Sequence, residues 1–163
     1  MSKIEDHFAK YQVDGEIVWP SESEERDRLA SDMLGAEITS SLDYWVDLAV
    51  DFVRNRVSST NFPRKNQAWQ HDITTRAAFA GLTAQQQDAV IRLVAQTASG
   101  TLFSALVAFD QCVGAEIRVD AYDPEISEKV ASILPGYIDF HDRLYDWIDA
   151  FSDHAERYDP NAP

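Results

Sequence analysis

The sequence predicts a mainly α protein: a compact bundle of about five to six helices with a minor two- or three-stranded β element near residues 11–19 and 115–122. Three observations support this fold class. The 163 residues are the length of one ordinary domain. Apolar residues make up 45% of the chain, close to the average for globular proteins. Apolar side chains also recur at spacings of three and four residues, which is typical of amphipathic helices.

The chain divides into an arm, one domain and a short tail. The arm, residues 1–20, is expected to contain a hairpin, because Asp14-Gly15 between apolar residues favours a tight turn. Residues 21–157 are predicted to form a single helical domain. Residues 158–163 are predicted to fray, as chain ends without packing usually do.

Local signals mark where the helices begin and end. Capping boxes, in which two side chains satisfy free backbone N–H groups at a helix start, are predicted at Ser21–Glu24 and Thr83–Gln86. Gly81 is expected to end one helix, and Gly100 to kink or divide another. The predicted helices are 21–33, 40–57, 67–80, 83–98, a short helix over 123–135, and 137–157. An apolar stretch that ends before Gly114 either continues the helix over 83–98 or forms a separate one.

Three segments support further predictions about burial and strand pairing. The helix over 40–57 places Leu42, Trp45 and Val46 on one apolar face, which is expected to be buried. The apolar stretch over 98–113 is interpreted as a buried core helix, too short to cross a membrane. Alternation over residues 115–122 predicts a strand, whose expected partner is the arm near residues 13–19.

The chain is strongly acidic, and the acid is unevenly distributed. The formal charge is −14, from 28 acidic and 14 basic residues. Residues 1–60 carry 13 acids and 6 bases (−7), residues 61–115 carry 3 and 4 (+1), and residues 116–163 carry 12 and 4 (−8). This balance argues against nucleic acids and anionic membranes as partners, because both repel such a chain. A partner steered by charge is expected to be basic.

The last predicted helix gives this charge a direction. Its acids recur every three or four residues, so they share one stripe, while the opposite face is apolar. A solvated face explains the stripe, yet like charges at this spacing destabilise a helix, and an all-acidic stripe also fits a basic protein partner. The partner-binding residues predicted on this basis are Asp139, Asp142, Asp146, Asp149 and Asp153.

Common catalytic and cofactor motifs are missing from the sequence. It contains no glycine-rich phosphate loop, no serine elbow and no helical His/Glu metal spacing, so no cofactor, metal or catalytic residue is predicted. The single cysteine, Cys112, lies in an apolar run and excludes an intrachain disulfide. With no apolar signal core in the first nine residues, a cytoplasmic location is expected.

One segment combines enough polar chemistry to line a pocket. Arg64, Trp69 and His71 place a base, an aromatic ring and an imidazole near a predicted helix start. His141, on the edge of the last apolar face, is a further candidate, although a satisfied and partly buried histidine is the alternative interpretation. A small-molecule binder or enzyme using this pocket is therefore one hypothesis.

In size, acidity and lack of these motifs, the chain resembles small bacterial helical proteins, some of which are similar to immunity proteins that neutralise a toxin through acidic surface contacts. No motif in the chain is specific to that group. The one-sided acidic stripe and the acidic flanks favour a non-enzymatic protein–protein interaction module that engages a basic partner, and an immunity-like inhibitor is one form of it. Two alternatives stay open: the pocket hypothesis above, and an oligomeric structural subunit using an apolar surface patch.

Overall fold

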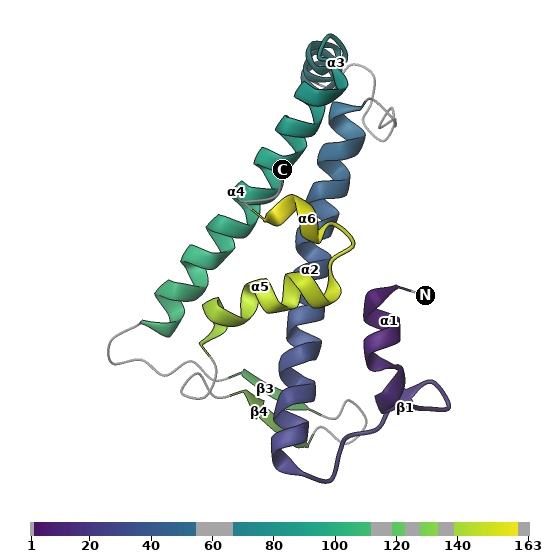
Figure 1. Cartoon of the computed structure of the whole chain (residues 1–163), viewed down its shortest axis with the longest axis vertical. Coiled ribbons are helices and arrows are strands. Elements are labelled where there is room, and N and C mark those ends of the chain that lie inside the picture. Colours follow the sequence, from purple (N-terminus) through teal and green to yellow (C-terminus); the bar gives the residue numbers. More distant parts are fainter. Residues whose placement is uncertain (1, 55–66, 112–118, 123–127, 134–138, 160–163) are drawn as a thin grey trace.

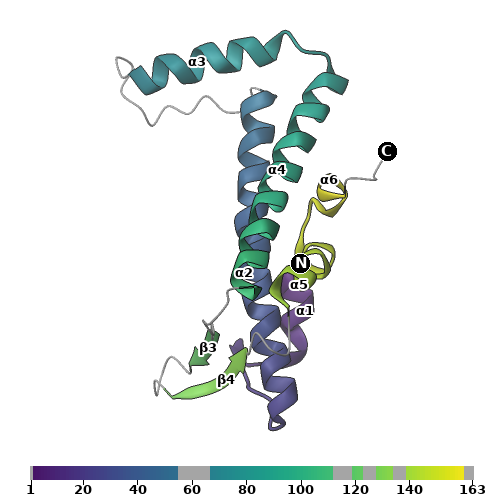
Figure 2. The same ribbon diagram turned by 90° about the vertical axis from the view of Figure 1, so that its left-hand side faces the viewer.

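Two long helices form the frame of the protein. The computed structural model describes residues 2–54, 67–111, 119–122, 128–133 and 139–159, with the backbone alone at 67–73, 119 and 133. Helix α2 (Ser23–Val53) and helix α4 (Ala84–Asp110) pack against each other, and α3 (Gln67–Ala80) lies across one end of the pair (Figure 1). Helices α5 (Phe140–Phe151) and α6 (Ala155–Tyr158) cover one side (Figure 2). The predicted mainly α class with a minor β element is confirmed.

Helix α2 is a single helix of 31 residues, so the predicted division into two helices near residues 33–40 is wrong. Gly35 lies inside it without breaking it, because its missing side chain leaves room for the indole ring of Trp147 from α5. The predicted capping box at Ser21 is also wrong. The helix begins at Ser23, and Glu22 occupies the cap position without a side-chain cap hydrogen bond.

The middle helices follow the sequence signals closely. Helix α3 has the predicted bounds, and α4 begins at the predicted capping box, with Thr83 and Gln86 hydrogen-bonded reciprocally. Gly100 neither ends nor divides α4, which continues to Asp110. Among the described residues, α4 is the one helix long and apolar enough to cross a membrane by length and composition. Between residues 98 and 110 only Ser99 and Leu106 are buried, so the described part of this stretch is not the buried core helix that was predicted.

The β structure consists of two separate hairpins in the described part of the chain. The arm holds a short helix α1 (Lys3–Phe8), a 3-10 turn (Ala9–Tyr11), and strands β1 (Gln12–Val13) and β2 (Glu16–Ile17). These strands pair antiparallel around Asp14-Gly15, where both residues have positive φ, so the predicted hairpin is confirmed.

The second hairpin corrects a predicted pairing. Strand β3 (Val119–Tyr122) pairs with β4 (Lys129–Ile133) rather than with the arm, and β4 occupies part of the predicted helix 123–135. A neighbouring strand supplied the hydrogen-bond partner that the alternating pattern required. Residues 123–127 lie outside the described residues.

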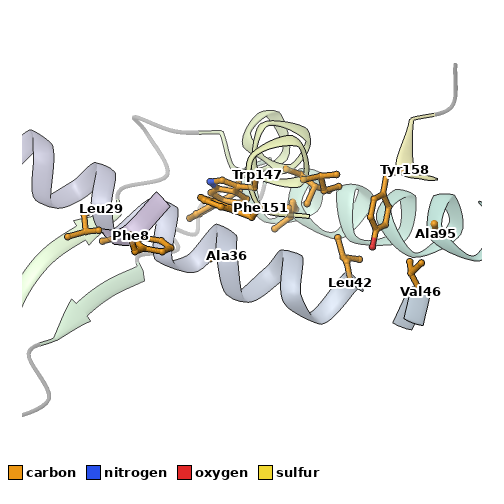
Figure 3. Close-up of a cluster of buried hydrophobic side chains, with 14 of the residues drawn as sticks. Phe8, Leu29, Ala36, Leu42, Val46, Ala95, Trp147, Phe151 and Tyr158 are labelled. Carbon is orange, nitrogen blue, oxygen red and sulfur yellow. The ribbon is translucent and has the colours of Figure 1, made fainter. Parts of the chain in front are cut away.

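The C-terminal part differs from prediction in two ways. The predicted helix 137–157 is interrupted at Ser152, which separates α5 from α6. Tyr158, expected to belong to a frayed tail, is 1% exposed and packs in the core. Figure 3 shows it reaching from α6 towards α2, beside Val46, while Trp147 and Phe151 project from α5 towards the same helix. Residues 160–163 of the predicted tail lie outside the described residues.

Candidate interaction surfaces: the acidic face of α5 and the α2–α4 groove

Helix α5 has a buried apolar face and an exposed acidic face. The opposite face, which was predicted to be apolar, is buried against the α2–α4 pair and consists of five residues: Phe140, Leu144, Trp147, Ile148 and Phe151. The carboxylates predicted for the outer face are all exposed: Asp139, Asp142, Asp146, Asp149 and Asp153. We call these five residues the acidic face. The first is the helix cap, three lie within α5, and Asp153 follows the helix end at Ser152.

Few cations neutralise the acidic face. Arg143 is the one Lys or Arg between residues 139 and 153. Its guanidinium contacts Asp146 at 3.3 Å and also Asp32 of α2 at 3.4 Å, so its charge is shared with a largely buried carboxylate. His141 lies 3.3 Å from Asp142. Ion pairs this exposed are worth about 1 kcal/mol or less and leave most of the negative charge available to a partner.

The turn after α5 is fastened to α2 by Asp43. Its carboxylate accepts hydrogen bonds from the Ser152 hydroxyl (2.6 Å), the Asp153 backbone N–H (2.9 Å) and the Tyr158 hydroxyl (2.9 Å). Burial raises the pKa of the Tyr158 hydroxyl far above its usual value, and the negative charge of Asp43 raises it further. His154, in the same turn, contacts Asp47 of α2 at 2.8 Å. Asp43 and Asp47 of α2 thus hold the turn after α5 in place.

His141 links α5 to the C-terminal end of α4. Its Nδ1 lies 2.7 Å from Asp110 Oδ2, and its backbone N–H donates to the same oxygen at 3.1 Å. The imidazole meets the ring of Phe103 edge-on, with centroids 5.5 Å apart. The hydrogen bond to Asp110 raises the pKa of His141, desolvation opposes this, and the charges of Asp142 and Asp139 add to it. This arrangement is a satisfied, partly buried histidine.

The His141–Asp110 pair is expected to make stability depend on pH. Because the folded pKa of His141 lies above its unfolded value of 6.5, its contribution is fully present below about pH 6.5 and is lost as the pH rises through the folded pKa. The Asp110→Asn variant should therefore return the His141 pKa towards 6.5 in an NMR titration. It should also lose part of the gain in stability that the wild type shows between about pH 8 and about pH 6. An unchanged His141 pKa in the variant contradicts this assignment.

The structure places His141 at the opposite end of α4 from helix α3. Arg64 lies outside the described residues, and Trp69 and His71 lie in the first turns of α3, where the backbone alone is described. Helix α3 adjoins the N-terminal end of α4, whereas His141 contacts Asp110 at its C-terminal end (Figure 1). His141 therefore does not share a site with α3. Within the described ranges, no group of three or more His, Cys, Asp or Glu residues is placed to hold a metal ion.

A different hollow runs between α2 and α4. It encloses about 910 Å³ and is lined mainly by apolar and small side chains of these two helices. Trp45, predicted to lie on the buried face of its helix, is 56% exposed and lines this groove. The sequence signal was present but misinterpreted: Trp45 follows Leu42 at a helical spacing, and the apolar arc of α2 is wider than its buried strip.

The described residues define a small, mainly helical protein with an acidic face on α5 and an apolar groove between α2 and α4. Comparison with protein-family models, with curated proteins and with solved structures gives no match for this chain.

Proposed function

We propose that this chain is a protein–protein interaction module whose acidic face binds a basic partner. The observation that supports the proposal most directly is the sorting of α5: every apolar side chain of its inner face is buried, and all five carboxylates of the acidic face are exposed. The buried face fixes the helix in place, so the carboxylates form a preorganised row. Such a row steers a basic partner and accelerates its association.

Two further features favour binding over simple solvation. Asp142 and Asp146, whose side chains are 72% and 66% exposed, lie one turn apart, where their repulsion destabilises the helix by about 0.2–0.5 kcal/mol. The single Arg143 is partly engaged with Asp32, beneath the face. A basic partner would offset this repulsion by supplying the cations that the face lacks.

The experiment compares paired charge reversals. The Asp146→Lys/Asp149→Lys variant changes the acidic face, while Glu16→Lys/Glu25→Lys makes the same change of net charge at exposed positions elsewhere. A partner is first captured from lysate of the source organism at low and at moderate salt, and its affinity for each variant is then measured. Reversal on the acidic face is expected to weaken binding at least tenfold at low salt and to reduce its salt dependence. The control should bind within about twofold of wild type.

Circular dichroism must first show that both variants are folded, as expected for substitutions at exposed positions. A partner that binds the acidic-face variant as tightly as the control overturns the proposal. So does the absence of any basic partner at either salt concentration.

A further inference from the structure

The α2–α4 groove has no occupant among the described elements. Its lining comes from α2 and α4 alone. Helices α5 and α6 lie on one side of this pair, while α3 and the β3–β4 hairpin extend to the other side at its two ends (Figure 2). Bulky side chains from both helices, Ile38, Trp45 and Leu93, alternate with small ones such as Ser41, Ala98 and Ala105. Leu93 is 64% exposed, more than any other large apolar side chain described.

The charge of the groove contrasts with that of the whole molecule. Glu37 is its one charged lining residue, and α4 carries three charged residues in 27, namely Asp88, Arg92 and Asp110. The chain as a whole carries −14. The groove therefore offers a strongly charged partner few opposite charges to pair with. Two identical acidic chains, in contrast, can approach each other here without bringing their acidic surfaces together.

We propose that the groove is the interface of a homodimer, in which the α2–α4 pair of a second copy packs to form a four-helix bundle. A twofold axis places the same patch on both sides, so bulky residues of one copy meet small residues of the other. Trp45 and Leu93 are the expected anchors, because large exposed apolar side chains set among small ones suit interdigitated packing.

The area of this face is sufficient for a stable dimer. Helix α4 has 27 residues and is therefore about 40 Å long. Two adjacent helices about 10 Å apart present a face about 20 Å wide, or about 800 Å² per copy. A specific interface of standard size buries about 800 Å² on each partner. The groove supplies the apolar centre of such a face, and Thr97 and Thr101 of α4 add hydroxyl groups to its lining.

The first measurement is the mass of the full chain in solution across a concentration series, by sedimentation or light scattering. One chain has a mass of 18.4 kDa, so the proposal expects twice this value at high concentration. A monomer at every concentration overturns it, and binding of that monomer to neutral phosphatidylcholine vesicles or to an apolar dye would assign the groove to lipid or small-molecule contact instead.

Matched substitutions then locate the interface. Trp45→Arg replaces a side chain that is 56% exposed in the groove, and Tyr122→Arg replaces one that is 57% exposed on β3. Trp45→Arg is expected to raise the dimer dissociation constant at least tenfold, whereas Tyr122→Arg should leave it within about twofold. Thr101→Arg adds a charge to the exposed α4 side of the groove and should also raise the dimer dissociation constant. It replaces Trp45→Arg in the experiment if Trp45→Arg folds poorly. A dimer unaffected by both groove variants overturns the assignment.

These measurements are independent of the acidic face, since the groove variants leave all five of its carboxylates in place. Loss of dimerisation with retained binding of a basic partner would support both proposals separately. Loss of partner binding in the Asp146→Lys/Asp149→Lys variant, with an intact dimer, would likewise show that partner binding and dimerisation use separate surfaces.

Discussion

Replacing Gly35 by alanine is expected to destabilise the protein by about 2 kcal/mol or more, although alanine is the better helix former by about 1 kcal/mol. A Cβ at this position would overlap three atoms of the Trp147 indole, far inside van der Waals contact. The ring cannot yield easily, because Trp147 is 1% exposed and its helix is held against α2 along its whole apolar face. Urea unfolding and thermal melting measure the loss, which corresponds to roughly 4–8 °C in Tm.

Gly100→Ala is the matched control. Gly100 also lies inside a long helix, yet no atom is found within 4 Å of the position its Cβ would take. This substitution should be neutral or stabilise by up to about 1 kcal/mol. Combining Gly35→Ala with Trp147→Leu should cost less than the sum of the two single changes, since the smaller side chain leaves room for the added methyl group. Equal effects of the two glycine substitutions would show that close helix packing is not the reason for Gly35.

Gly35 also shows where interpretation of the sequence fails. Local signals predicted the bounds of α3, the start of α4 and the arm hairpin, because caps, stops and tight turns depend on a few neighbouring residues. Gly35 resembles a helix stop in the same way. Its role depends on Trp147, more than a hundred positions later, and no local pattern contains that partner. The β3–β4 pairing was missed for a related reason, since a strand pattern does not specify its mate.

The candidate sites show the same difference between features set by neighbouring residues and features set by residues far apart in the sequence. Periodicity alone predicted which side chains of α5 are buried and which carboxylates are exposed, because one amphipathic helix contains both faces. The α2–α4 groove was not predicted, because its two walls are distant in the sequence and its Trp45 satisfies the pattern of a core residue. A helical pattern of apolar residues indicates a face suited to burial. It does not indicate whether that face is covered by the same chain or by a partner.

Replacing Asp43 by alanine is expected to cost about 3 kcal/mol or more. The change removes the acceptor for three hydrogen bonds and leaves the hydroxyl donors of Ser152 and Tyr158, which are 0% and 1% exposed, without the carboxylate acceptor they have now. A buried donor left unsatisfied costs about 1–3 kcal/mol, and hydrogen bonds to a charged acceptor are at the strong end of the range. The Tm should fall by roughly 6–12 °C in thermal unfolding followed by circular dichroism.

Asp149→Ala provides the control, because its exposed carboxylate belongs to the acidic face and its loss should change stability by no more than about 0.5 kcal/mol. In a Tyr158→Phe background, the cost of Asp43→Ala should shrink by about 1 kcal/mol, since one of the unpaired donors is already gone. A full additive cost in that background would mean that Tyr158 does not depend on Asp43. The comparison also bears on the acidic face. Asp43 anchors the turn that carries Asp153, so Asp43→Ala should weaken binding of a basic partner indirectly, through loss of stability. Asp149→Ala should weaken the same binding without a comparable loss of stability.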